Sequence, residues 1–333
     1  MACKRSGVQF PSAPPMTMVA IVMRTYERPV LLARAIASVQ NQTFSDWELI
    51  IVNNGGDPAR VESVVSVARN TTGTSAITVL HLPERVGMEE ASNQGLRATS
   101  STYFAIHDDD DSWRPTFLET VVQTFSSHPV ASAVLTGVTR VYETFKGGKV
   151  WPEKHENFPL DDARLTYERL IGGNTFPPIA ALFRRSLLDN AGYFDPSLPV
   201  LGDWEFNLRA VRRGEFVFVP ERLANYHTRT PESDRAAGNS ITVGEDLHLR
   251  VKKELQERWD SEMEPHGVSK GQYSRDVEAE VAFAEAKLQA EIAEAQRAQS
   301  QRSTVRRIAG AIRDPKRAVR AAVHLGRTLA KRR

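Results

Sequence analysis

Four consecutive carboxylates, residues 108–111, follow the apolar run at 103–106 after a single histidine. Adjacent negative charges repel one another, so a folded protein holds them together only with a counter-charge. Ligand sets made of oxygen alone select hard divalent ions such as Mg2+ or Mn2+. Because the run follows a buried strand, the ion would lie at the carboxyl edge of a sheet, where α/β folds bind ligands. The pattern predicts a metal that holds a phosphorylated substrate, and the alternative is a solvated acidic turn before a helix that begins at Pro115.

The elements that must position these carboxylates alternate along the chain. Fully apolar runs such as residues 19–23 are typical of strands that are buried in a parallel sheet. Between them lie stretches of helical periodicity, the first of which can begin at Pro29. The alternation predicts an α/β fold with a doubly wound, mostly parallel sheet. We expect strands at 19–23, 48–52, 77–82, 103–106, 133–141, 179–183 and 216–219, and helices at 29–39, 61–65, 88–98 and 203–213.

The bulk composition is that of an ordinary soluble globular protein, with 333 residues of which 41% are hydrophobic and 25% charged. This length allows one large domain or two. The single cysteine, Cys3, excludes a disulfide framework and a cysteine-rich zinc site. No apolar stretch approaches the ~18 residues that a transmembrane helix needs. The net charge of +2 is unevenly divided, because residues 303–333 hold ten Lys or Arg against one Asp and carry +9, which leaves −7 elsewhere.

Composition divides the chain into four segments. The first has neither the apolar core nor the cleavage pattern of a signal peptide, so we interpret it as non-native or disordered and expect translation to begin at Met16 or Met18. The second is the α/β domain, whose polar residues 228–243 indicate a linker or mobile loop. The third is a helical extension with a narrow apolar stripe, typical of either a surface helix or a coiled coil. The fourth is the basic amphipathic tail. The segments comprise residues 1–15, 16–243, 244–302 and 303–333.

Five motifs in this order resemble the inverting family 2 glycosyltransferases of GT-A fold. They are IVMRTYERP, FSDWELIIVNNGG, Asn93 with Gly95, HDDDDSWRP and LGDWEFNLRA. Each motif alone is weak, but their common order and spacing over residues 18–227 make a strong signal. The resemblance implies a sheet of the nucleotide-diphospho-sugar transferase type within 16–243, and a hexosyl-type transfer in polysaccharide biosynthesis.

The resemblance also implies which residues hold the donor. The loop after the first strand would contact the nucleotide through Thr25, Tyr26 and Glu27, with the Tyr26 ring against the base. The family usually has two Asp at the end of the second strand, and this chain has Asn53 and Asn54. The amide of Asn54 can accept the N3–H of uracil, so a UDP-sugar is the expected donor, although an amide can also donate. A plain turn at this Asn pair is the alternative. Asn93 is the remaining expected donor contact.

The acidic run resembles the family's Asp-x-Asp metal motif. The resemblance implies that Asp110 ligates Mn2+ or Mg2+ directly, that Asp108 supports the metal and the donor, and that Asp109 lies near the ribose. Asp111 is as suited to capping the following helix. A divalent ion that bridges the two phosphates would stabilise the charge that develops on the diphosphate as it leaves.

A base for the acceptor hydroxyl is the remaining requirement. The segment GDWEF resembles the family's acidic base motif, which makes Asp203 the expected base and places Trp204 and Glu205 at the acceptor. The rival interpretation is that Asp203 is only the N-cap of its helix. His227 could ligate the metal or touch phosphate, but a lone His is more often structural. The implied mechanism is a single displacement with inversion, which requires one base and no enzyme nucleophile.

The basic tail at 303–333 and the acceptor complete the expected partners. Two short amphipathic stretches among arginines suggest an anionic membrane surface. Nucleic acid would attract the same charge but is not expected, and a solvated tail is the alternative. The resemblance implies a glycan or lipid-linked acceptor and a cytoplasmic protein, at the inner face of the cell membrane if the tail binds there.

Two other functions remain as alternatives. A nucleotidyltransferase of related fold should have a glycine-rich phosphate loop after the first strand, and residues 24–28 contain no glycine. A catalytically inactive basic binding protein would not need the acidic run or Asp203. A dinucleotide-dependent dehydrogenase is excluded, because no G-x-G-x-x-G follows the first strand.

Overall fold

The structure is a computed structural model that describes residues 17–72, 76–160, 165–229 and 245–263. The expectations for segment 1–15 and for the basic tail at 303–333 lie outside these ranges, as do those for most of the linker and of the helical extension. Within the described ranges, no helix combines the length and the apolar character that a bilayer crossing requires.

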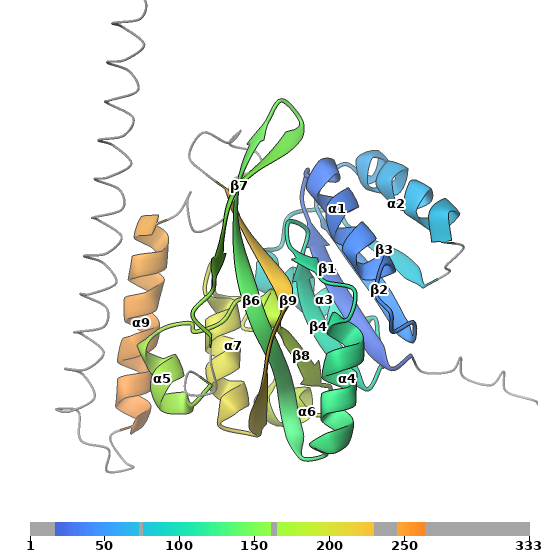
Figure 1. The fold of residues 1–333 in the computed structure, drawn as a ribbon. Helices are drawn as coiled ribbons and strands as arrows, with labels where there is room; N and C mark the ends of the chain where they lie inside the picture. The colour runs from blue at the N-terminus through green and yellow to red at the C-terminus, as the bar shows by residue number, and fades with distance from the viewer. Residues whose placement is uncertain (1–16, 73–75, 161–164, 230–244, 264–333) are drawn as a thin grey trace, which may run out of the picture. The chain divides into compact units, whose positions relative to one another are not determined.

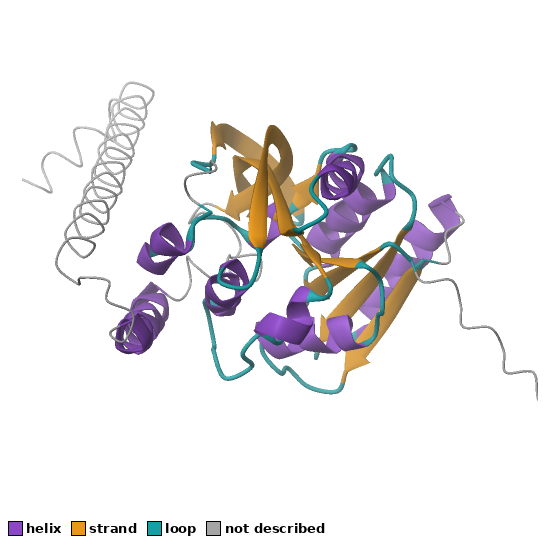
Figure 2. Ribbon diagram, turned by 90° about the horizontal axis from the view of Figure 1, so that it is seen from below, coloured by secondary structure: helices purple, strands orange, loops and turns teal. Residues whose placement is uncertain are grey.

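A mixed sheet has the strand order β3-β2-β1-β4-β8-β6-β9-β5, and β7 pairs with β6. Strands β3, β2, β1 and β4 are parallel to one another, and helices lie on both faces of the sheet (Figures 1 and 2). This arrangement confirms the predicted doubly wound α/β fold. Strand β8 lies between β4 and β6 and is antiparallel to both. The strands are β1 (Val19–Thr25), β2 (Trp47–Asn54), β3 (Ile77–Leu82), β4 (Tyr103–Asp108), β5 (Ser112–Trp113), β6 (Ala131–Lys146), β7 (Lys149–Asn157), β8 (Ala181–Arg184) and β9 (Glu215–Arg229).

The first half of the fold follows directly from the apolar pattern. Residues 19–23 of β1 are fully buried, and one face of α1 is buried in the core as well. Gly95 allows α3 to lie close to the sheet, because a Cβ there would lie 3.1 Å from Val52 Cγ2 and closer still to Val22 Cγ1. The helices of this half are α1 (Pro29–Gln40), α2 (Pro58–Thr72), α3 (Met88–Arg97) and α4 (Phe117–Ser127).

The second half adds a long hairpin and short helices. The β6–β7 hairpin extends beyond the neighbouring strands (Figure 1), and its turn has two glycines at positive φ, Gly147 and Gly148. The aromatic rings of Trp204 on α7 and Trp259 on α9 pack edge to face at 4.8 Å. The remaining helices are α5 (Tyr167–Gly172), the short 3-10 helix η2 (Pro178–Ala180), α6 (Leu187–Ala191), α7 (Gly202–Val211) and α9 (Glu245–Met263).

The structure differs from the local expectations in several elements. The helix after the acidic run begins at Phe117 with Thr116 as N-cap, so neither Pro115 nor Asp111 starts it. Helix α7 has Leu201 as its N-cap, which places Asp203 inside the first turn. Strand β9 continues to Arg229, so the first two residues of the expected linker are strand. Strand β7 was missed because its side chains are largely exposed and therefore show no burial pattern.

Candidate functional site

The carboxyl ends of β1, β2 and β4 meet at one edge of the sheet. Arg24 of β1 stands opposite Asp108 of β4, and Thr25 stands opposite Asn53 of β2. Arg24 donates from Nε to Asp108 Oδ1 at 3.1 Å and forms an ion pair with the same carboxylate through Nη2. The acidic run therefore lies at the edge of the sheet at which the sequence predicted it.

Three carboxylates of the run converge. Asp108, Asp110 and Asp111 each offer an oxygen, and these oxygens lie within 4.8 Å of one another. Asp111 is 1% exposed and its Oδ1 accepts the backbone N–H of His227 at 2.8 Å. Its Oδ2 is buried without a hydrogen-bond partner among the described residues. Burial and the charges of Asp110 and Asp108 raise the pKa of Asp111 well above its ordinary value, although Arg229 and the bond from His227 oppose the shift.

Arginines from three elements surround Asp110. Arg28 donates to Asp110 Oδ2 at 3.1 Å, and Arg229, at the end of β9, pairs with the same oxygen. Arg34 donates to the backbone carbonyl of Asp110. Burial alone would raise the pKa of Asp110, but Arg28, Arg229 and Arg34 hold it below its ordinary value. Asp110 therefore carries its negative charge at neutral pH.

Glu143 of β6 connects these cations. Glu143 is 1% exposed, and it pairs with Arg34 at 2.7 Å and with Arg229 at 3.0 Å. Its Oε2 also lies 2.8 Å from Nδ1 of His227. Burial opposes the charge, but the hydrogen bonds from His227 and Arg34 lower the pKa of Glu143 to about 2. His227 Nε2 lies 3.0 Å from Ser112 Oγ, which places this histidine in the polar network beside Asp111.

Asp109 faces the other side of the run. It is fully buried, accepts from Thr25 Oγ1 at 2.7 Å and pairs with Arg28 at 3.1 Å. Burial raises the pKa of Asp109 to about 6, although Arg28 opposes the shift. Thr25 and Asp109, two of the expected donor contacts, are hydrogen-bonded to each other.

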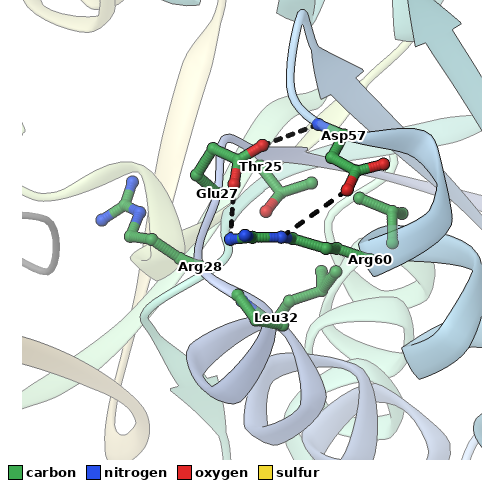
Figure 3. A pocket seen from close by; sticks show the side chains of 8 residues that line it. Thr25, Glu27, Arg28, Leu32, Asp57 and Arg60 are labelled. Atoms are coloured by element: carbon green, nitrogen blue, oxygen red, sulfur yellow. Dashed lines mark hydrogen bonds and ion pairs between the residues drawn. The ribbon is translucent and has the colours of Figure 1, made fainter. Parts of the chain in front are cut away.

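The loop after β1 forms the rim of the site. Tyr26 is 39% exposed, and the guanidinium of Arg85 lies 4.7 Å from its ring. Glu27 has a positive φ of 54° and accepts from Asp57 N at 2.6 Å and from Arg60 at 2.9 Å. Figure 3 shows Glu27, Asp57 and Arg60 around a small pocket, which Thr25 and Arg28 also line. The bonds to Asp57 and Arg60 hold Glu27 in a backbone conformation that non-glycine residues rarely adopt.

Asn54 and Asn93 form backbone links. Asn54 Oδ1 accepts from Val86 N at 2.9 Å, and its Nδ2 donates to Gly87 O at 3.0 Å. Asn93 bonds both backbone groups of Phe194, at 2.9 and 3.1 Å. The structure therefore uses both amides to hold neighbouring loops and does not present them to a donor.

Asp203 lies in the first turn of α7 and within the electrostatic influence of Arg24. Its Oδ2 accepts from Asn174 Nδ2 at 2.6 Å. Burial raises the pKa of Asp203 above its ordinary value, with Asn174 and Arg24 opposing the shift and Asp108 adding to it. The charges of Arg24 and Asp108 both act on Asp203, so this carboxylate is electrostatically coupled to the acidic run.

Trp204 and Glu205 are not placed as expected. Trp204 is 1% exposed and donates from Nε1 to Leu170 O, so its ring is core and not an apolar face for a sugar. Glu205, also 1% exposed, pairs with Arg209 at 2.7 Å and with Arg258 at 2.9 Å. Neither side chain is available to an acceptor.

Several functional candidates were not found from the sequence. Arg28 lies within the motif IVMRTYERP, close after β1, and could have been singled out as a cation beside the acidic run. Arg34, Glu143 and Arg229 come from α1, β6 and β9 and carry no local pattern, so only the fold brings them together.

Comparisons with known proteins agree with this geometry. The family model described as "Glycosyl transferase family 2" matches residues 20–192. The "Uncharacterized glycosyltransferase YwdF" of Bacillus subtilis (strain 168) is 30% identical over 202 residues, which cover 61% of this chain and 71% of that protein. The "Putative colanic acid biosynthesis glycosyl transferase WcaA" of Escherichia coli (strain K12) is 29% identical over 199 residues, which cover 58% and 66%. Other relatives are longer, and the chain spans 37% of the Escherichia coli protein "Chondroitin synthase".

Solved structures show the same fold. S. aureus TarS 1-349 in complex with UDP-GlcNAc superposes with a TM-score of 0.53 at 18% identity, covering 72% of this chain and 66% of that one. This likeness establishes the GT-A architecture, and the family model establishes the activity class. The chain belongs to glycosyl transferase family 2 and is a glycosyltransferase.

Proposed function

We propose that this chain is a metal-dependent inverting glycosyltransferase that moves a sugar from a nucleotide sugar to a hydroxyl of a glycan or lipid-linked acceptor. The observation that carries the proposal is that two acidic groups act on Arg24. Asp108, which converges with Asp110 and Asp111, forms an ion pair with Arg24, and the charge of Asp203 acts on the same guanidinium. A transfer of this kind needs a site for the diphosphate and, facing it, a base.

The residues present fit a hard divalent ion. Asp108, Asp110 and Asp111 supply only oxygen atoms, and a buried carboxylate oxygen without a partner, as in Asp111, is costly unless a cation joins it. We therefore assign these three residues to Mn2+ or Mg2+, which when bound would stabilise the charge on the departing diphosphate. Arg28 and Arg229 keep Asp110 ionised at neutral pH. This set adds Asp111 to the expected ligands.

The donor would enter along the loop after β1. The exposed ring of Tyr26, with Arg85 against it, offers a flat surface for a nucleobase. The bonds that fix Glu27 hold that loop in one conformation, which lowers the entropic cost of binding. We propose a UDP-sugar donor, and the UDP-GlcNAc that S. aureus TarS 1-349 binds is of this class. Asp109 and Thr25 would lie below the ribose.

Asp203 would act as the base. A carboxylate whose pKa burial has raised accepts a proton more readily than one in water. The bond from Asn174 helps to orient the carboxylate, which would take the proton of the acceptor hydroxyl as it attacks the anomeric carbon. Because attack and departure occur on opposite faces of the sugar, the product has the inverted anomeric configuration.

The acceptor is proposed from the names of the relatives. WcaA is named for colanic acid biosynthesis, and chondroitin synthase is also a polysaccharide enzyme by name. A polysaccharide or its lipid-linked precursor is therefore the proposed acceptor class. We further propose that residues 303–333 bind an anionic membrane surface at the cytoplasmic side, as their charge of +9 suggests.

Release of nucleoside diphosphate from a panel of nucleotide sugars tests the function. We expect release with one UDP-sugar in Mn2+ or Mg2+ and none with a chelator, and the anomeric configuration of the product by NMR tests inversion. Asp203→Asn is the control for adventitious hydrolysis. Activity that persists in chelator, or a retained configuration, would refute the proposal. Formation of a nucleotide sugar from a sugar phosphate and UTP would instead favour a nucleotidyltransferase.

A further inference from the structure

Glu89 of α3 is a buried carboxylate that the proposed mechanism does not use. It is 3% exposed, and its Oε1 accepts the backbone N–H of Gly202 at 3.2 Å. Its Oε2 is buried without a hydrogen-bond partner among the described residues. An unpaired buried carboxylate oxygen is costly, so its retention calls for a functional explanation.

Helix α7, which carries Asp203, has no cap of its own. Its N-cap residue, Leu201, makes no side-chain capping bond and has a positive φ of 63°, which a leucine rarely adopts. Glu89 supplies the missing acceptor from another helix, and a negative charge at this end of a helix is favourable. Gly202 is needed for the contact, because a Cβ there would lie 2.6 Å from Glu89 Cδ and closer still to Cγ and Oε1.

Glu89 also lies within the charge pattern around the base. The charged groups that act on it are Arg24 of β1 and Asp203 of α7, and Arg24 is itself paired with Asp108 of β4. Burial and the charge of Asp203 raise the pKa of Glu89 to about 7, although Arg24 opposes the shift. Near neutral pH, Glu89 therefore changes its charge next to Asp203.

We propose that Glu89 is a positioning residue for Asp203, which it serves by capping α7 from α3 and by placing a second carboxylate beside the base. This inference rests on the proposed function, in which Asp203 is the base. Its first consequence is structural: the Glu89 carboxylate helps to hold the first turn of α7 by accepting the backbone N–H of Gly202. Its second is electrostatic: the protonation of Glu89 sets the charge that Asp203 experiences.

A double-mutant cycle on thermal unfolding tests the contact without any assay of activity. Gly202→Ala introduces a Cβ into the Glu89 carboxylate, and Glu89→Ala removes the atoms that this Cβ would meet. We expect Gly202→Ala to lower the unfolding midpoint of the wild-type chain and to lower it less in the Glu89→Ala background. In the control background Glu90→Ala, whose carboxylate pairs with Arg97 instead, the full decrease should remain. Equal decreases in all three backgrounds would overturn the proposal.

Kinetics test the positioning. Displacing a base by about 1 Å costs on the order of 10²-fold in rate, so Glu89→Ala should lower kcat on that scale and leave the KM for the donor unchanged. Glu89→Gln keeps an oxygen for the Gly202 N–H but not the charge. It should restore most of kcat and abolish the inflection near pH 7 that ionisation of Glu89 gives the wild-type profile.

Two results would overturn the positioning role. One is an Ala variant with wild-type kcat, and the other is a Gln variant that keeps the inflection. Transfer that survives Asp203→Asn would refute the proposed base, and the role of Glu89 with it. The unfolding cycle would be unaffected in that case, so failure of the proposed function is distinguishable from failure of the contact.

Discussion

Replacing Glu143 by Gln removes one negative charge from the centre of the arginine network and changes the side-chain volume little. The carboxylate is 1% exposed, and its pKa is lowered from 4.5 to about 2. Each pH unit of that depression corresponds to about 1.4 kcal/mol, so the folded protein gains about 3 kcal/mol from ionised Glu143 at pH 7. This value agrees with the general cost of removing one partner of a buried ion pair, which is about 3–5 kcal/mol. We expect Glu143→Gln to lower the free energy of unfolding by about 3 kcal/mol at pH 7.

The sign of the pH dependence follows from the depressed pKa. The contribution of Glu143 is fully present above pH 4.5 and is lost as the pH falls towards 2. The difference between wild type and Glu143→Gln should therefore shrink as the pH is lowered through this interval. Urea unfolding at several pH values measures it directly.

Glu156→Gln provides the matched control for this measurement. Glu156 lies on the paired strand β7, its side chain is 38% exposed, and it pairs with Lys154 at the surface. Its substitution should cost less than about 1 kcal/mol, as exposed ion pairs do. A loss below about 1 kcal/mol for Glu143→Gln at pH 7, or a loss that is equal at pH 7 and pH 3, would refute the assignment of Glu143 as the anion that holds Arg34 and Arg229.

Three further outcomes are expected. Asp110→Ala should abolish the metal-dependent binding of a nucleoside diphosphate in calorimetry without unfolding the chain, and unchanged binding would contradict the ligand assignment. Asp203→Asn should reduce transfer by ~10²-fold or more while donor binding stays near normal, whereas a change in thermal stability alone would leave Asp203 a structural residue. Truncation after Arg302 should preserve transfer to a soluble acceptor mimic and weaken salt-sensitive cosedimentation with anionic vesicles. Equal pelleting of both forms would leave the tail as solvated charge.

The parallel half of the fold was predictable because burial there leaves a strong local pattern. Residues 19–23 and 48–52 are strands in the structure, and the apolar face expected after Pro29 is the buried face of α1. Parallel strands end at one edge, so the place of the acidic run followed from the strand that precedes it. The apolar runs of buried parallel strands therefore allowed us to predict both the fold and the edge of the sheet at which the acidic run lies.

Side-chain roles were less predictable because they depend on contacts between distant elements. Trp204 lies in a motif that the family resemblance assigns to the acceptor, yet Trp259, far along the chain, packs against its ring. Arg229 was assigned to a polar linker, because the residues after it are polar and nothing in the sequence reveals its pairing with Asp110. Glu89 lies on an amphipathic helix next to Glu90, and only the packing of α7 distinguishes the buried carboxylate from its partly exposed neighbour.

The concentration of buried charge at one edge of the sheet is difficult to explain by stability alone. A buried ion pair is weak evidence for stability, since apolar residues of similar volume often serve a fold as well or better. Here Arg24, Asp110 and Glu143 are each drawn into such pairs, while single oxygens of Asp111 and Glu89 have no hydrogen-bond partner among the described residues. One of these oxygens belongs to Asp111, a proposed metal ligand, and the other to Glu89, whose carboxylate accepts from Gly202, the residue before the proposed base. The reaction that we propose at this edge of the sheet accounts for the cost of the buried charge.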